Sequence, residues 1–278
     1  MRIDLHVHSN RSDGVHDPSV VARMGLEGRL DVLAITDHDT HSGYASAFEE
    51  TQRAGGPLLI EGVEFTTWFA STEVHILGYF PQGTTPKVHE LMRSLQSERI
   101  ERMRQGVEAL SELGLVIQFE DVQACSKGDT MSRSHLAQAL VKKRVIRSYG
   151  EAFRKYLSSE HGLIPCPTRG AEEVIALIAE EGGVSVWAHP SLDLFDAHIH
   201  EFKEMGLEGV EVYFKRASGA HEYLFEKVSD DLGLLRSGGS DWHGHPGQGK
   251  LGTYVVPGEQ IEGLLERLGI PQASSPQT

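Results

Sequence analysis

Short apolar runs alternate with amphipathic stretches along the first 80 residues of the chain. Four of these runs have the length and composition of strands, and they cover Ile3–His8, Val32–Thr36, Leu58–Phe65 and Val74–Phe80. Helical periodicity lies between them at Pro18–Gly28, where Asp17 precedes a proline at the first helical position, and at Tyr44–Ala54. This alternation predicts an α/β fold with a parallel sheet.

The alternation stops between about residues 84 and 168. A long, heavily charged helical pattern runs from Pro86 to about Leu113, and shorter ones follow at Ser134–Lys143 and Gly150–Leu157. After a helix at Glu172–Glu181, strand patterns return over Val184–Trp187, Gly209–Phe214 and Leu234–Ser237. We expect about seven strands, formed by residues 1–83 and 169–278, with residues 84–168 inserted as a helical cap.

Composition and charge exclude several classes of protein. The chain has 278 residues, a formal net charge of −14, 15 histidines and two cysteines, Cys125 and Cys166. The negative charge disfavours a protein that coats nucleic acid, and two cysteines cannot make a disulfide framework or a four-cysteine zinc site. The start MRIDLHVHS has no signal-peptide pattern, and no apolar run is long enough to span a membrane, so we expect a cytoplasmic protein.

Histidines and carboxylates gather where the predicted strands end or in the loops that follow. The nine residues of this kind are His6, His8, Asp13, His38, Glu64, His75, His189, Asp241 and His243. In a barrel of parallel strands, the carboxyl ends of the strands meet at the active site. We therefore expect these side chains to bind two to three divalent metal ions, with Mn, Fe and Zn all compatible with imidazole and carboxylate ligands. The other histidines, His245 among them, are assigned no role.

The same positions resemble a known family. The motifs are His6-x-His8, Ser12-Asp13-Gly14, Thr36-Asp37-His38, Gly62-Val63-Glu64, Val74-His75, Ala188-His189-Pro190 and Ser240-Asp241-Trp242-His243, and as an ordered set they resemble the polymerase and histidinol phosphatase (PHP) family over residues 1 to about 250. The resemblance implies a distorted seven-stranded TIM-like (βα) barrel with a trinuclear metal site. It implies one ion on His6, His8, Glu64 and Asp241, a second on Glu64, His75 and His189, and a third on Asp13, His38 and His243.

A narrower resemblance lies in the inserted segment. Met131–Leu136 and Phe153–Leu157 are similar to the PHP branch that includes 3′,5′-nucleoside bisphosphate phosphatases, some of which also trim short RNA from its 5′ end. After Leu157 the chain departs from that pattern, because Ser158–Gly162 replaces a more basic stretch. The expected contacts to substrate phosphate are Arg133 at a helix start, His135 as a contact or a brace for Arg133, and Lys215 or Arg216 after the sixth strand.

These features predict a metal-dependent phosphoesterase that hydrolyses phosphate monoesters of nucleotides. The expected nucleophile is a water activated by the ions, and no side chain is assigned as general acid. Three alternatives remain open from the sequence: a phosphatase of another small substrate such as histidinol phosphate or a nucleoside monophosphate, a DNA-repair nuclease, and a non-catalytic PHP module. The expected partner is a small phosphorylated substrate of the nucleotide type, with short RNA as a further candidate.

Overall fold

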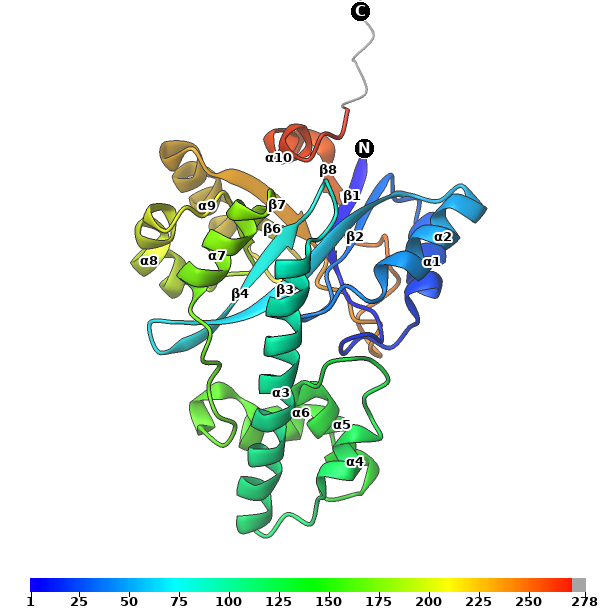
Figure 1. Cartoon of the computed structure of the whole chain (residues 1–278), viewed down its shortest axis with the longest axis vertical. Helices are drawn as coiled ribbons and strands as arrows, with labels where there is room; N and C mark the ends of the chain where they lie inside the picture. Colours follow the sequence, from blue (N-terminus) through cyan, green and yellow to red (C-terminus); the bar gives the residue numbers. More distant parts are fainter. Residues whose placement is uncertain (272–278) are drawn as a thin grey trace, which may run out of the picture.

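One curved sheet forms the centre of the computed structural model, which describes residues 1–271 (Figure 1). Its strands are β1 (Arg2–Val7), β2 (Val32–Ile35), β3 (Leu58–Phe69), β4 (Thr72–Tyr79), β5 (Val184–Trp187), β6 (Gly209–Phe214), β7 (Leu235–Gly239) and β8 (Val256–Pro257). They are hydrogen-bonded in the order β7-β6-β5-β4-β3-β2-β1-β8. The eighth strand was not predicted, and it pairs through only two residues with the outer end of β1.

The sheet closes into a barrel because the segment after β7 lies against β1. The backbone N–H of Asp241 donates to the carbonyl of His6 at 2.9 Å, and that of His8 donates to the carbonyl of Trp242 at 2.8 Å. Gly239 permits this approach, since a Cβ there would lie 2.5 Å from the backbone nitrogen of His6. The prediction of an α/β, TIM-like barrel is confirmed.

The prediction of an all-parallel sheet is wrong at β4. This strand runs antiparallel to both β3 and β5, whereas β1–β2, β2–β3, β5–β6 and β6–β7 are parallel. A two-residue turn, Ala70 and Ser71, makes the reversal, and both residues have positive φ (45° and 63°). Hairpin turns of this type usually contain Asn or Gly, so the sequence carried no hairpin signal here. The hairpin also lengthens β3, which places Glu64 in the middle of the strand rather than at its end.

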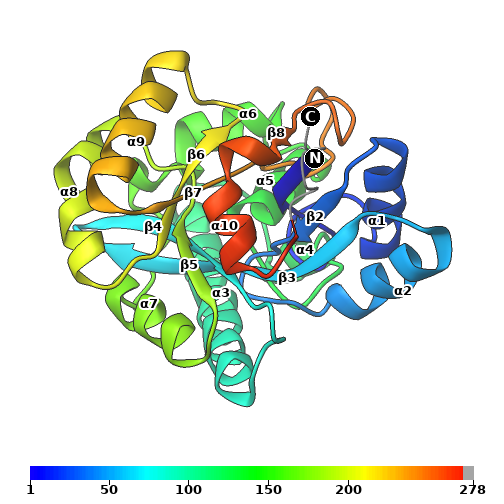
Figure 2. The ribbon, with the colours of Figure 1, turned by 90° about the horizontal axis from the view of Figure 1, so that it is seen from above.

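Helices surround the barrel on its outer side, except the last of them, which lies across the end of the barrel where β1 begins (Figure 2). They are α1 (Pro18–Glu27), α2 (Tyr44–Ala54), α7 (Ala171–Glu180), α8 (Leu192–Glu204), α9 (Gly219–Leu232) and α10 (Glu262–Arg267), with the short η3 (Gly258–Gln260) before the last. As expected, Asp17 caps α1 by accepting the N–H of Ser19. Among residues 1–271, no helix is long and apolar enough to cross a lipid bilayer.

The segment between β4 and α7 is helical. It contains α3 (Pro86–Glu112), α4 (Phe119–Gln123), α5 (Arg133–Lys142), α6 (Tyr149–Ala152), η1 (Phe153–Leu157) and η2 (Ser159–His161). Figure 1 shows α3 extending away from the barrel, with α4, α5 and α6 beside its far half. The first half of α3 packs into the barrel core through residues such as Leu91 and Leu95, whereas Met103, Val107 and Leu110 belong to a separate core with α5. One helix therefore contributes side chains to both cores.

Buried polar contacts hold the helical segment against the barrel. The guanidinium of Arg99 on α3 forms an ion pair with Asp39 after β2, and it also donates to the hydroxyl of Thr66 on β3 and to the carbonyl of Met131. Gln96 donates to the carbonyl of Asp39 at 2.8 Å. Because Arg99 and Asp39 are both buried, removing either partner would leave an unpaired charge, and the pairing fixes the position of the cap.

Candidate metal centre

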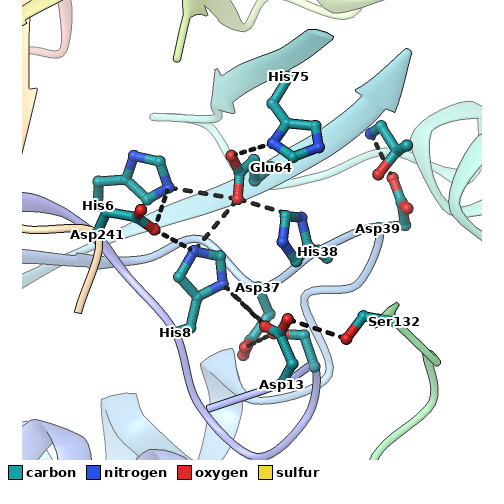
Figure 3. A network of polar contacts seen from close by, with 12 residues as sticks. His6, His8, Asp13, Asp37, His38, Asp39, Glu64, His75, Ser132 and Asp241 are labelled. Atoms are coloured by element: carbon teal, nitrogen blue, oxygen red, sulfur yellow. Dashed lines mark hydrogen bonds and ion pairs between the residues drawn. The ribbon is translucent and has the colours of Figure 1, made fainter. Parts of the chain in front are cut away.

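Five imidazoles converge on the carboxylate of Glu64 at the centre of the barrel mouth. Its two oxygens lie 3.3 Å from His6, 3.2 Å from His8, 3.1 Å from His38, 2.9 Å from His75 and 3.1 Å from His189. Figure 3 shows four of these rings around Glu64, each from a different direction. The five imidazoles come from β1 and the residue just after it, from the loop after β2, from β4 and from the loop after β5. No other carboxylate in residues 1–271 contacts so many imidazoles.

The reversed direction of β4 explains how His75 reaches this point. In the β3–β4 hairpin, His75 is paired with Thr66, two residues beyond Glu64. Since β4 begins at the barrel mouth, a residue near its start lies level with the carboxyl ends of the parallel strands. His75 therefore joins the cluster from the amino-terminal half of its strand.

A second set of side chains lies beside the first. Asp13 contacts His243 at 3.3 Å and His8 at 3.9 Å, and Asp241 contacts His8 at 3.4 Å and His6 at 3.7 Å. Four groups have ligand atoms that all lie within 4.8 Å of one another: His8, Asp13, His38 and His243; His6, Glu64 and His189; His6, His8 and Asp241; and His38, Glu64 and His75. The structure thus brings together all nine residues that the sequence singled out.

Unpaired buried atoms show that this donor set fits metal ions. Six buried ligand atoms have no hydrogen-bond partner within the described chain: Nε2 of His6, Nε2 of His8, Oδ1 of Asp13, Nδ1 of His38, Oε2 of Glu64 and Nδ1 of His75. Unsatisfied polar atoms in a protein interior are costly unless an ion or water satisfies them. Imidazole nitrogens and carboxylate oxygens at these separations are the ligand types of Mn, Fe and Zn sites.

The charges in the cluster perturb one another strongly. Burial acts to raise the pKa of Glu64, but His38, His75 and His6 hold that pKa well below its usual range. Burial likewise opposes the charged form of His8 and His75, yet the adjacent carboxylates raise the pKa of His8 to about 10 and that of His75 to about 9. Without cations, protons would occupy these sites. Cations bound there would displace the protons, because a coordinating imidazole must be neutral.

Two supporting carboxylates were missed by the sequence analysis. Glu211 on β6 is fully buried, accepts from Nδ1 of His6 at 3.0 Å, and accepts from the backbone N–H of His189 at 2.7 Å. Asp37 accepts from the hydroxyl of Ser12, which lies 3.4 Å from Nδ1 of His8. Such contacts fix which ring nitrogen faces the centre. A lone glutamate within the apolar strand GVEVYF was the available signal for Glu211.

Glu73 forms a third support and connects the centre to two arginines. Its carboxylate contacts Nε2 of His75 at 3.3 Å, Arg133 at 2.8 Å and Arg102 at 2.5 Å. Burial acts to raise the pKa of Glu73, but His75, Arg133 and Arg102 hold that pKa well below its usual range. Glu73 is therefore a charged link between a predicted ligand and the cap.

Backbone strain is found at three positions of the centre. His189, Asp241 and Asp39 have positive φ, at 30°, 51° and 54°. Non-glycine residues in this region cost free energy and persist where surrounding contacts enforce them. In these conformations the side chains of His189 and Asp241 lie toward Glu64, and the carboxylate of Asp39 lies against the guanidinium of Arg99.

An open cleft of about 450 Å³ leads to the cluster. Seven of the nine predicted ligands line it, all except His6 and His8. Arg133, Tyr149 and Phe153 of the helical segment line it as well, together with Arg216 and His245. The rings of Tyr149 and Phe153 lie 5.0 Å apart, and those of Tyr149 and His245 lie 5.7 Å apart. The cleft thus offers aromatic faces and arginines beside the metal-binding groups.

The four predicted phosphate contacts fall in different places. Arg133 and Arg216 line the cleft, the latter with its guanidinium 2.8 Å from Asp241. His135 lines a separate depression with Asn10 and Lys127, and its Nδ1 accepts the N–H of Ser132 at the start of α5. Lys215 donates to the carbonyl of Gln248 in an adjoining depression. His135 therefore braces the helix start that carries Arg133, and Lys215 does not line the cleft over the centre.

Comparisons with known proteins agree on one family. The sequence profile of the PHP domain matches residues 4–161. The 3′,5′-nucleoside bisphosphate phosphatase of Chromobacterium violaceum is 33% identical over 258 residues, covering 89% of this chain and 88% of that protein. The 5′-3′ exoribonuclease Rnm of Escherichia coli is 30% identical and covers 97% of this chain and 94% of its own length. A crystal structure assigned to the metal-dependent phosphoesterases, from Bifidobacterium adolescentis, superposes with a TM-score of 0.82 at 30% identity over 95% of this chain and 96% of that one.

Proposed function

This chain belongs to the PHP family, as its motifs indicated, and we propose that it is a metal-dependent phosphoesterase acting on 3′,5′-nucleoside bisphosphates. The observation that carries the proposal is the convergence of five imidazoles on Glu64 beneath a cleft lined by arginines. A buried carboxylate among imidazoles suits several cations, and arginines suit phosphate.

The ligand sets remain those implied by the family resemblance. His6, His8, Glu64 and Asp241 would hold one ion, Glu64, His75 and His189 a second, and Asp13, His38 and His243 a third. The spatial groups agree with this division in two respects, since Glu64 belongs to two of them and Asp13 groups with His38 and His243. His75 and His189 both group with Glu64, but in separate groups that also contain His38 and His6, respectively. When bound, such ions activate water at neutral pH and stabilise charge on phosphoryl oxygens.

The chain's own residues position the reactants. Glu211, Ser12 and Glu73 orient the rings of His6, His8 and His75, respectively. Arg216, next to Asp241, would contact the phosphoryl group that is cleaved, whereas Arg133 on the cap would contact the phosphate that is kept. Tyr149 and Phe153 supply aromatic faces for the base.

Hydrolysis of short RNA is a second activity that one observation favours. The E. coli relative, whose name is 5′-3′ exoribonuclease, matches almost the whole chain, including the helical segment. Both activities are the same reaction if water attacks the phosphorus that is bonded to the 3′-oxygen. In each case the bond between that phosphorus and the 3′-oxygen breaks, and a nucleoside 5′-phosphate is released. We therefore assign the 3′-phosphate as the phosphate that is hydrolysed, and the 5′-phosphate as the one that Arg133 binds and that stays on the product.

Metal analysis combined with a substrate panel tests the proposal. Purified protein should contain two to three divalent ions per chain, and it should release phosphate from adenosine 3′,5′-bisphosphate faster than from a nucleoside monophosphate or histidinol phosphate. Chelation should abolish the activity, and adding back Mn, Fe or Zn should restore it. Equal rates on all three substrates, or undiminished activity after chelation, would contradict the proposal.

A further inference from the structure

A depression adjoins the cleft over the metal-binding groups, next to Asp241. Its volume is about 330 Å³, and Arg216, Asp241 and Gln248 line both spaces. The remaining residues around it come from the end of β6 and from the loops that follow β6 and β7. All of its lining residues thus belong to the barrel, so a substrate that extends past Asp241 into this outer depression would leave the cap behind.

The outer depression carries an excess of positive charge. Its charged side chains are those of Lys215, Arg216 and Asp241, and the carboxylate of Asp241 is a proposed metal ligand. The chain as a whole has a formal net charge of −14, so two adjacent cations at this edge run against its general charge. A phosphate that links two nucleosides carries one negative charge, which a single lysine or arginine neutralises.

Lys215 is held at this depression although its side chain is exposed. Its ammonium group donates to the carbonyl of Gln248. The side-chain oxygen of Gln248 accepts the backbone N–H of His243 at 3.0 Å and that of His245 at 3.1 Å. The loop that positions Lys215 is therefore tied to a proposed metal ligand, His243. An ammonium group has three donors, so two of them remain for a bound phosphate.

The two arginines of the cleft lie on different sides of the centre. Arg133 contacts Glu73, the carboxylate that supports His75. Arg216 lies 2.8 Å from Asp241, and Figure 3 shows His75 and Asp241 on different sides of the central carboxylate. If Arg133 holds the 5′-phosphate of the first nucleotide and the attacked phosphorus lies at the centre, the rest of an RNA chain extends past Arg216.

Resting on the proposed function, we infer that the outer depression binds the nucleotide that follows the cleaved linkage of short RNA, and that Lys215 binds the phosphate on the 3′ side of that nucleotide. The chemical class is a 5′-phosphorylated oligonucleotide of three or more nucleotides. Water adds to the first linking phosphorus, the bond from that phosphorus to the 3′-oxygen breaks, and that oxygen takes a proton. The phosphate stays on the 5′-oxygen of the next nucleoside, so the shortened RNA again has a 5′-phosphate.

Three substrates with the same 5′ end test this inference. They are adenosine 3′,5′-bisphosphate and the 5′-phosphorylated adenosine dinucleotide and trinucleotide, each of which releases adenosine 5′-monophosphate. Lys215→Ala should lower kcat/KM about tenfold on the trinucleotide, mainly by raising KM, as expected for one hydrogen bond to a charged group. The same variant should change little on the bisphosphate and the dinucleotide, because neither has a phosphate beyond the one that is attacked.

Two further variants separate a phosphate contact from a general effect. Lys203→Ala is the matched control, since Lys203 is also an exposed lysine that donates to a backbone carbonyl, that of Gly233, but it lies on α8 outside the barrel. It should leave all three substrates unaffected. Lys215→Arg keeps the positive charge and should recover most of the loss on the trinucleotide.

Equilibrium binding gives a readout that does not depend on turnover. A trinucleotide with a methylene group in place of the first linking 3′-oxygen resists hydrolysis, and calorimetry measures its affinity. Lys215→Ala should weaken its binding about tenfold. The variant should also reduce the slope of log Kd against log salt concentration by about 0.7, the contribution of one neutralised phosphate in a single strand.

The outcomes distinguish failure of this inference from failure of the proposed function. Equal losses of Lys215→Ala on the trinucleotide and the bisphosphate, no loss on the trinucleotide, or an unchanged salt slope would overturn the inference. Hydrolysis of the bisphosphate by a protein that leaves the trinucleotide intact would also overturn it, while the phosphatase activity would stand. Hydrolysis of none of the three substrates by the metal-loaded protein would instead contradict the proposed function.

Discussion

The hydroxyl of Ser132 donates a 3.0 Å hydrogen bond to Oδ2 of Asp13. Ser132 is the N-cap of α5, and its side chain also accepts the N–H of Ser134 at 3.1 Å. The same serine therefore starts the helix that carries Arg133 and holds a proposed metal ligand from the barrel. Through this contact the position of the cap and the geometry of the metal centre depend on each other.

Replacing Ser132 with alanine should affect both stability and metal affinity. Loss of the helix cap costs about 1 kcal/mol, and loss of the donor to the buried Asp13 costs about 1 kcal/mol more. Freed from its support, Asp13 should bind its ion about tenfold more weakly. Urea unfolding measures the first effect, and metal titration of the folded protein measures the second.

Ser218→Ala is the matched control for this variant. Ser218 caps α9 with the same serine–histidine arrangement, in which His221 takes the place of His135, but it is exposed and does not contact a proposed ligand. We expect this variant to lose about 1 kcal/mol of stability at most and to bind metal normally. A comparable loss of metal affinity in both variants would show that the contact to Asp13 has no special role.

Glu64→Gln should remove metal and activity together. The amide keeps the shape of the side chain but lacks the charge that five imidazoles and two proposed ions share. We expect at least one ion fewer per chain and a loss of kcat/KM greater than about a hundredfold. A loss of about a hundredfold is the upper end of what is seen when a residue that only hydrogen-bonds to a metal ligand is replaced. The control is Glu61→Gln on the same strand, which lies outside the cleft and should keep its full metal content. Full turnover by Glu64→Gln would refute the proposed mechanism.

Glu61 also gives a pH-dependent prediction for stability. Burial acts to raise the pKa of this carboxyl, but hydrogen bonds from His41 at 2.7 Å and Thr84 at 2.6 Å lower it below its ordinary value. A lowered pKa means that the ionised form stabilises the folded state above the ordinary value of 4.5, and that this stability is lost as the pH falls through the folded-state pKa. Glu61→Gln should therefore cost about 1 kcal/mol at pH 7 and progressively less below pH 4.5 in urea unfolding of the metal-free protein. A cost that does not change with pH would contradict this assignment.

The sequence predicted most of the centre because its signals are local. His6 and His8 share one face of a strand, and motifs such as Asp37-His38 and Asp241-Trp242-His243 directly follow buried strands. In a βα barrel, strand direction alone brings such positions to one end. The fold class and the convergence of most of the nine residues follow from that rule, whereas His75 joins them from the reversed strand β4.

The remaining features depend on contacts between distant segments. The reversal at β4 rests on Ala70 and Ser71, whose left-handed conformation is enforced by the pairing of the two strands rather than by their own preference. Glu73 acquires its role only because Arg102 and Arg133 reach it from the helical segment. The sequence suggested Arg133 as a phosphate contact but gave no indication that a carboxylate already holds it.

The pairing of Arg133 with Glu73 bears on the effect of Arg133→Ala. If Arg133 binds the retained phosphate, its loss should lower kcat/KM about ten- to a hundredfold on adenosine 3′,5′-bisphosphate, the scale of a charged hydrogen bond of about 1.5–3 kcal/mol. Hydrolysis of 4-nitrophenyl phosphate, which has no second phosphate, should change little. Arg93→Ala, at an exposed position on the long helix α3, is the control and should leave both substrates unaffected. Arg133→Ala also leaves Glu73 with Arg102 as its remaining arginine partner. A second variant, Arg133→Lys, is therefore needed to separate the effect of the charge from that of the side-chain geometry. Lysine keeps the charge but not the fork of donors, and it should recover only part of the activity on the bisphosphate. Equal losses on both substrates would instead place Arg133 on the phosphate that is cleaved.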